Sequence, residues 1–375
     1  MAVLLDRLKV RAKAVSAALD VGQTALRVAQ IKRDGARWVV TTAGTCRRRS
    51  PERGGDEALF AARVARWLNQ LGLQRRDIVA GLSPPDVELH AINLSNSDAS
   101  ADAESPGEAV RAELERLTSF DSTSAETDYW RLPESPALRS QVVGVAARRD
   151  GIASALALCE AAGLDCHRID ATPCALARFG TMYRGHSATE EDVWSVLDMG
   201  GRMSRIIVCA GGTPILARAF VYGGRAWTDK LAQSLAVSPQ TAEQHKRDHG
   251  VAHGDAPHGT DGGSAGNVLG DLIFNVLRSD LDEMVEELER SYRYVMQCFP
   301  RRAPGPLVLV GGGAVLRGLD VFLQERLGVT VLTPGITEPE GSLLDLTACG
   351  QDSVSSASAY ACAIGLAIPQ ESADG

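Results

Sequence analysis

The sequence predicts an α/β protein of two lobes with a ligand cleft between them. Three observations support this fold class. A strand–turn–strand unit with the pattern Asp–x–Gly occurs twice, at Asp20 and at Asp198. A Gly311–Gly312–Gly313 turn follows a later apolar strand, and predicted strands alternate with predicted helices along the chain. An internal repeat indicates the architecture of a whole fold, so the two Asp–x–Gly units are the strongest evidence for two similar lobes.

The composition is that of an ordinary globular protein. The chain has 375 residues, of which 45% are hydrophobic and 23% charged, which is enough for several domains. Proteins that bind nucleic acid without sequence specificity usually carry an excess of basic residues. The net charge of this chain is -8, so we expect no nucleic-acid partner. No apolar run reaches about 18 residues, so we expect no direct membrane span. The eight cysteines form no C-x-x-C pair, which is typical of buried thiols in the reducing cytoplasm.

The first half of the chain predicts a sheet, a helix and a small inserted module. Two strands flank the turn at Gly22–Gln23–Thr24, and a third follows over 31–42. A helix over 56–72 ends on Gly72, and a short strand covers 77–82. The module has β-α-β-β-α order, with strands over 87–94, 129–132 and 140–147 and helices over 106–117 and 150–163.

The second half repeats the opening and then becomes helical. Residues 193–221 give a strand, the turn Asp198–Met199–Gly200, a strand, a Gly–Gly turn and a third strand. The remaining expected elements are helices within 226–247, a long helix over 269–299, a strand over 306–310, a helix over 316–327, a strand over 329–333 and a last helix over 357–368. We interpret 251–267, with His253 and His258, as a loop rather than a metal site.

These elements predict a division of the chain into four parts. The first-lobe core comprises 14–85 and 167–192, with a C-terminal helix, 355–370, packing back on it. The inserted module comprises 86–166, the second-lobe core 193–222 and 300–354, and a helical subdomain of the second lobe 223–299.

The repeated turns suit a polyphosphate ligand. A tight turn aims backbone N–H groups at a phosphate, and glycine permits close approach. Because like charges repel, we expect Asp20 and Asp198 to hold Mg²⁺ from opposite sides of the cleft instead of touching phosphate. We also expect the helix after Gly313 to present its N-terminus to the cleft. One such turn alone is typical of a plain hairpin.

Glu243 and Lys246 lie three residues apart on one predicted helix face. They form either a polar clamp on a ribose or an ordinary surface ion pair. The spacing alone leaves both interpretations open.

With these motifs established, the chain resembles the actin/Hsp70 ATPase superfamily and, within it, the PilM family of type IV pilus assembly, which is related to FtsA. The resemblance is carried by LDVGQTALRVAQIKR (19–33), CEAAGLDCHRIDATPCALAR (159–178), the segment 215–250 beginning ILARAFVYGGRAW, LVLVGGGAVLRGLDVFLQERLGVTVLTPG (307–335) and AYACAIGLAI (359–368). It implies an actin/Hsp70-like two-lobed fold with a small β-α-β-β-α insertion in the first lobe.

The resemblance also implies a site for ATP and Mg²⁺. The implied residues are Asp20, Gly22, Gln23 and Thr24 in the first phosphate turn, Asp198, Gly200 and Gly201 in the second, Gly311, Gly312 and Gly313 in the adenosine turn, the paired Gly223 and Gly224, and Glu243 and Lys246 as the ribose and adenine clamp. Asp20 and Asp198 are the implied metal-binding residues.

Two departures from the family pattern bear on hydrolysis. The second turn continues as Arg202–Met203–Ser204 instead of small hydroxyl residues, so that it can fill the pocket or place Arg202 on a phosphate oxygen. Thr172 replaces an acidic residue before the proline, and threonine is not an efficient general base. We therefore expect nucleotide binding with weak or no ATPase activity.

The function implied is that of a cytoplasmic ATP-binding scaffold, peripheral at the inner membrane through a partner. That partner is the N-terminal tail of a PilN-like inner-membrane protein, docked in a groove beside the inserted module, with the pilus motor ATPases as a further connection. Two alternatives stay open. An active ATPase or phosphotransferase needs a carboxylate base in the cleft. An FtsA-like filament former usually carries a C-terminal amphipathic helix, which the polar end AIPQESADG does not match.

Overall fold

The structure is a computed structural model of the chain. It describes residues 15–48, 57–73, 75–94, 105–121, 124–132, 141–185, 192–251, 268–298, 304–351 and 357–369. His253 and His258 lie outside these residues, and so does most of the loop that contains them.

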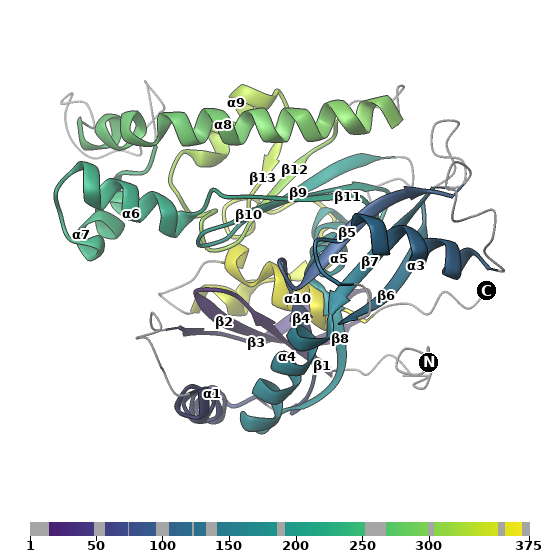
Figure 1. Cartoon of the computed structure of the whole chain (residues 1–375). Helices are drawn as coiled ribbons and strands as arrows, with labels where there is room; N and C mark the ends of the chain where they lie inside the picture. Colours follow the sequence, from purple (N-terminus) through teal and green to yellow (C-terminus); the bar gives the residue numbers. More distant parts are fainter. Residues whose placement is uncertain are drawn as a thin grey trace.

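The first lobe is built on a six-stranded sheet with the strand order β14-β3-β2-β1-β4-β8 (Figure 1). β1 (Val15–Val21), β2 (Ala25–Asp34) and β3 (Arg37–Arg47) form an antiparallel meander, and β4 (Asp77–Leu82) and β8 (Asp165–Ala171) extend it in parallel. The helices α1 (Glu57–Leu71) and α4 (Arg149–Ala161) cover its outer face, where Val64 and Leu68 of α1 are fully buried.

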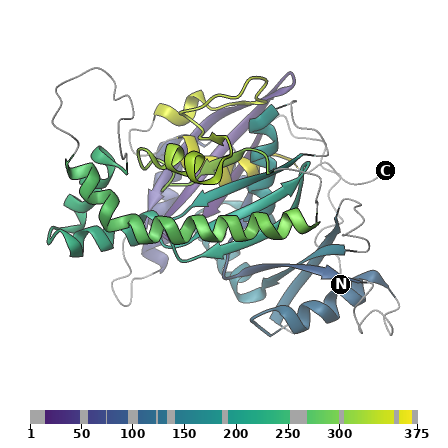
Figure 2. The ribbon, with the colours of Figure 1, turned by 90° about the horizontal axis from the view of Figure 1, so that it is seen from above.

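The second lobe repeats this plan on a five-stranded sheet of order β11-β10-β9-β12-β13. β9 (Val193–Met199), β10 (Ser204–Ala210) and β11 (Thr213–Phe220) are antiparallel, and β12 (Leu307–Val310) and β13 (Val331–Leu332) join in parallel. The helices α8 (Val268–Cys298) and α9 (Leu319–Leu327) pack on the outer face, as the view from above shows (Figure 2). α6 (Gly224–Ser234) and α7 (Pro239–His249) lie at one end of α8.

A helical layer joins the two sheets. It consists of α5 (Thr172–Arg184), the short helix η4 (Ala357–Tyr360) and α10 (Ala361–Ala367), and its buried side chains form one cluster with residues of both sheets. α10 packs very closely on α5, because a Cβ atom added at Gly365 would lie 2.0 Å from the carbonyl oxygen of Ala175. The two lobes therefore share a common core at the base of the space between them.

The inserted module is a three-stranded sheet of order β5-β7-β6 with one covering helix. Its elements are β5 (Val87–Asn93), α3 (Pro106–Leu117), β6 (Ala125–Arg131) and β7 (Gln141–Arg148), followed by α4. α3 covers one face, where Val110 and Leu114 are buried, and the other face contacts β11 of the second lobe. There the indole nitrogen of Trp130 donates to the carbonyl oxygen of Pro214 over 3.0 Å. The two-lobed α/β fold with a β-α-β-β-α insertion is confirmed.

Three local features differ from the predicted elements. α4 follows the module in sequence, but it buries Cys159 in the first-lobe core beside α1. β14 (Leu344–Asp345) pairs in parallel with β3, so this part of the predicted second-lobe segment 300–354 lies in the first-lobe sheet. The helix expected from residue 316 begins at Leu319, after Gly318 in the left-handed region (φ 79°). Its N-terminus therefore does not continue directly from the Gly311–Gly312–Gly313 turn.

Candidate functional site

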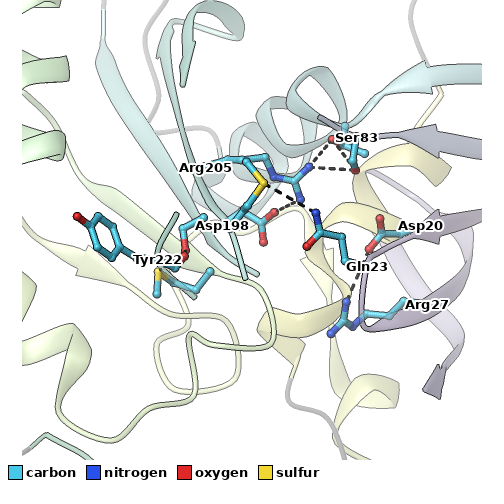
Figure 3. A network of polar contacts seen from close by, with 11 residues as sticks. Asp20, Gln23, Arg27, Ser83, Asp198, Arg205 and Tyr222 are labelled. Atoms are coloured by element: carbon cyan, nitrogen blue, oxygen red, sulfur yellow. Dashed lines mark hydrogen bonds and ion pairs between the residues drawn. The ribbon is translucent and has the colours of Figure 1, made fainter. Parts of the chain in front are cut away.

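The two Asp–x–Gly turns lie against each other between the lobes (Figure 3). Across the gap, the side-chain nitrogen of Gln23 lies 3.8 Å from the sulfur of Met203. A Cβ atom added at Gly201 would lie 2.6 Å from the methyl carbon of Thr24. The sequence repeat is thus a repeat in space, with one turn from each lobe meeting at the centre of the molecule.

Each aspartate pairs with an arginine on the next strand. Asp20 of β1 lies opposite Arg27 of β2, and Asp198 of β9 lies opposite Arg205 of β10. Nη1 of Arg27 is 3.8 Å from Oδ2 of Asp20, and Arg205 forms an ion pair with Asp198. Both carboxylates are almost wholly buried, at 5% and 6% exposure. Sequence reasoning missed these arginines, although the equal seven-residue spacing in both repeats is visible in the sequence.

Arg205 also connects the second lobe with the first. Its Nη1 donates to Oγ of Ser83 over 3.0 Å and to Oγ1 of Thr172 over 2.8 Å. Ser83 follows β4, and Thr172 opens α5, so both acceptors belong to the first lobe. The two hydroxyl groups are themselves hydrogen-bonded over 3.2 Å. The guanidinium group is consequently held by a carboxylate of its own lobe and by two hydroxyls of the other.

Burial controls the electrostatics of this centre. Desolvation raises the pKa of Asp20, and the neighbouring Asp198 raises it further, whereas Arg27 and Arg205 lower it. Cys362 of α10 is hydrogen-bonded to Asp20, and burial, with the nearby aspartates, raises the pKa of its thiol well above the ordinary value. The centre therefore contains two buried carboxylates whose charge is balanced by two arginines.

This arrangement does not fit a resident Mg²⁺. The ion prefers oxygen ligands in near-octahedral geometry, but the oxygens of Asp20 and Asp198 face guanidinium groups. Two unit charges about 4 Å apart interact by about 4 kcal/mol at an effective dielectric constant of about 20, so a dication beside Arg205 meets strong repulsion. Among the described residues, no group of three or more His, Cys, Asp or Glu side chains could hold a metal. The metal role of the two aspartates thus stays a prediction that the side chains do not support.

The Gly311–Gly312–Gly313 turn closes over the same centre. Gly311 has φ 92°, and a Cβ atom there would lie 2.4 Å from Oδ1 of Asp198, so both its conformation and its surroundings favour glycine. The amide of Gly313 donates to the carbonyl oxygen of Met199 over 2.8 Å. The turn predicted to hold adenosine is therefore packed directly on the second Asp–x–Gly turn.

The paired glycines and the Glu243–Lys246 pair form one further cluster beside the second turn. The amide of Gly224 donates to the carbonyl oxygen of Gly200 over 2.9 Å, and a Cβ atom at Gly223 would lie 2.6 Å from the carbonyl oxygen of Gly201. Lys246, only 7% exposed, donates from Nζ to the carbonyl oxygen of Gly224 over 2.6 Å.

Lys246 is thus an internal cation. Its Nζ also lies 2.7 Å from Oγ1 of Thr228 and 2.6 Å from Oε2 of Glu243. Burial opposes ionisation of Glu243 and raises its pKa. The charge of Lys246 and the hydrogen bonds from Lys246, Thr228 and Arg247 outweigh this effect and lower the pKa to about 2. Of the two sequence interpretations, an ordinary surface ion pair does not describe this geometry.

Arg202 of the second turn lies at the surface and pairs with a neighbouring carboxylate. Arg202, which the sequence could place on a phosphate, is 62% exposed and points to Asp229, with 3.4 Å between Nη2 and Oδ2. Gly22 closes the first turn by donating to the carbonyl oxygen of Ala25 over 3.1 Å. The structure therefore brings the predicted glycines, aspartates and Lys246 together, and it adds Arg27 and Arg205 as partners of the aspartates.

Comparison with known proteins supports the fold described above. The sequence profile of the family described as "Type IV pilus assembly protein PilM" matches residues 18–371. The solved "PilM-PilN type IV pilus biogenesis complex" is similar in structure, with a TM-score of 0.69, 23% identity and coverage of 94% of this chain and 97% of that one. The ethanolamine utilization protein EutJ from Carboxydothermus hydrogenoformans is also similar, with a TM-score of 0.51, 15% identity and coverage of 94% and 89%. The fold is that of the actin-like ATPases.

Proposed function

Because the chain belongs to the PilM family of type IV pilus assembly proteins, we propose that it is an ATP-binding scaffold of the pilus inner-membrane assembly complex. Its partner is the N-terminal tail of a PilN-like membrane protein, which it connects to the pilus motor. The similar solved structure is a PilM-PilN complex, and this chain shares its fold with the matched chain of that complex over nearly the whole length of both. The protein is accordingly cytoplasmic and reaches the inner membrane through this partner. Among the described residues, no helix is long and apolar enough to cross a bilayer.

The single observation that supports nucleotide binding is that the two repeated turns lie against each other between the lobes. Gln23 and Thr24 of one lobe approach Gly201 and Met203 of the other, with the Gly311–Gly312–Gly313 turn packed against them. Backbone-rich turns of this kind bind phosphate through their amide groups. A nucleotide seated there touches both lobes, so it biases their relative position and with it the surface offered to a partner.

The centre favours holding ATP over hydrolysing it. Thr172 cannot act as an efficient general base at neutral pH, and its hydroxyl accepts from Arg205. The nearby Asp170 is an unsuitable substitute, because Arg168 and Arg178 both pair with it. These contacts argue against the alternative of an active ATPase or phosphotransferase.

A concave site for the partner tail lies beside the inserted module. A cavity of about 310 Å³ is lined by Leu216 and Arg218 of β11 and by Arg290 and Tyr294 of α8. Pro214, two residues before Leu216, receives the hydrogen bond of Trp130 from the module. The lining combines apolar and aromatic surface with two arginines that share one carboxylate, Glu287, which suits a short peptide with apolar side chains and an acidic group that can share these arginines.

A peptide with the sequence of the cognate PilN-like tail tests this proposal. We expect saturating peptide to raise the melting temperature of the full-length protein, because ligands of the native state stabilise it. Arg218→Glu should abolish the shift, whereas Arg326→Glu should keep it, because Arg326 is an exposed arginine of α9 that pairs with Asp282 and does not line the cavity. An unchanged melting temperature of the wild-type protein at saturating peptide would refute the scaffold role.

A further inference from the structure

Arg205 pairs with Asp198, one of the two aspartates expected to hold a metal. Its guanidinium group contacts Asp198, and its charge acts on Asp20 as well. Figure 3 shows the group between the two lobes, pointing from β10 toward Ser83. We infer that Arg205, assisted by Arg27, replaces the divalent cation, so that the protein binds a nucleoside polyphosphate without Mg²⁺.

The negative charges of the two aspartates are already balanced without a metal. Arg27 and Arg205 together carry the same charge as one Mg²⁺, and they balance Asp20 and Asp198. Arginine stays protonated at every physiological pH, so this positive charge is permanent. The planar guanidinium also matches phosphate oxygens, to which it can donate two parallel hydrogen bonds.

The position of Arg27 extends this positive charge to the adenosine turn. A Cβ atom added at Gly312 would lie 2.9 Å from Nη2 of Arg27. One arginine thus faces the Gly311–Gly312–Gly313 turn, and the other pairs with the aspartate of the second phosphate turn. A polyphosphate that enters from the glycine turn meets a guanidinium group from each lobe.

The contacts of Arg205 oppose its displacement by a metal. Moving the side chain away would break its ion pair with Asp198 and its hydrogen bonds to Ser83 and Thr172. Thr172, with 0% exposure, would keep a buried hydroxyl with one partner fewer. Arg205 therefore also links the lobes in the absence of any ligand.

The inference rests on the proposed nucleotide site, and ATP titrations of the full-length protein separate the two. The protein is first stripped of nucleotide, which heat release and chromatography verify. Calorimetric titrations with ATP are then run in Mg²⁺ and in excess EDTA. We expect the two dissociation constants to agree within about threefold.

Arg205→Gln provides the converse test. Removing the guanidinium frees the two aspartates, so ATP affinity should fall about tenfold or more in EDTA and recover with Mg²⁺. Electron paramagnetic resonance with Mn²⁺ should detect bound Mn²⁺ in this variant and only free Mn²⁺ in the wild type. Arg326→Gln is the matched control, because it removes the same charge from an exposed site on α9 and should behave like the wild type.

The outcomes separate clearly. Wild-type binding that appears in Mg²⁺ and vanishes in EDTA would overturn the inference while leaving the nucleotide site intact. Wild-type protein that binds ATP in neither condition would overturn the nucleotide proposal itself, and the inference with it. The wild-type titrations decide both points even if Arg205→Gln fails to fold.

Discussion

Arg205 on β10 of the second lobe donates a hydrogen bond to Thr172, the first residue of α5, over 2.8 Å between Nη1 and Oγ1. This bond joins a position next to the second Asp–x–Gly turn to the position where the family usually has an acidic residue. The departure at Thr172 is therefore tied to the arginine that pairs with Asp198. The guanidinium group of Arg205 donates to the hydroxyl of Thr172, which stands where the family usually has an acidic side chain.

Thr172→Val removes this interlobe hydrogen bond while keeping the shape of the side chain. Because the donor is charged and the hydroxyl buried, we expect a loss of about 1.5–3 kcal/mol of unfolding free energy. Thr181→Val, on the same helix, removes only a bond to the carbonyl oxygen of Ala177 and should lose about 1 kcal/mol. Urea denaturation measures both, and equal losses would contradict the interlobe role of Thr172.

Lys246→Met tests the internal cation beside the paired glycines. The change leaves Glu243 without its closest cation and the carbonyl oxygen of Gly224 with Thr228 as its remaining side-chain donor, so we expect a loss of about 2 kcal/mol. Arg247→Met removes the other, more exposed partner of Glu243 and should lose less than about 1 kcal/mol. If the two variants were equally stable, Lys246 would be no more than a surface partner.

The pKa of Glu243 predicts an acid-dependent term in stability. Its folded-state pKa of about 2 lies below the ordinary value of 4.5, so ionised Glu243 stabilises the fold above about pH 4.5. That contribution is lost as the pH falls from about 4.5 through about 2. Denaturant titrations should therefore show a steeper decline in this window for wild type than for Glu243→Gln. Parallel curves would show that the ion pair adds nothing. The pKa of Asp20 is raised in the fold, so ionisation of Asp20 lowers the free energy of unfolding, the opposite of the effect of Glu243.

Gly223→Ala tests the close contact between α6 and the second turn. The new methyl group would lie 2.6 Å from the backbone oxygen of Gly201, so the turn must move, and we expect weaker ATP binding. Gly212→Ala is the control, because its Cβ atom would meet its nearest neighbour, Oγ1 of Thr181, at an ordinary 3.7 Å. Titration calorimetry with ATP compares the two, and wild-type affinity in Gly223→Ala would remove the second turn from the site.

Local patterns predicted most of the fold. The Asp–x–Gly repeat, the alternating strands and the amphipathic helices depend on short-range signals, and the structure has β1–β3 and β9–β11 where those signals lie. β14 has only two residues, too few for any periodicity, and its pairing with β3 depends on the path of the whole chain. α9 begins later than the sequence predicts, because Gly318 adopts a left-handed conformation that interrupts the expected helix.

The site was predictable where residues act through the backbone and not where they act through tertiary contacts. Glycine turns are recognisable because glycine permits conformations closed to other residues. The role of Arg205 depends on Ser83 and Thr172, which are distant in sequence and approach it only when the lobes assemble. The spacing of Glu243 and Lys246 shows a shared helix face, but only the packing of α7 on α6 shows that this face is buried.

In the proposed function, the nucleotide between the lobes controls the surface that receives the partner tail. The most direct measurement is calorimetric titration of the PilN-like tail peptide into full-length protein, with and without saturating ATP. We expect ATP to tighten peptide binding at least about fivefold, and the peptide to tighten ATP binding by the same factor, because coupling between sites is reciprocal. Equal peptide affinity in both conditions would contradict the account.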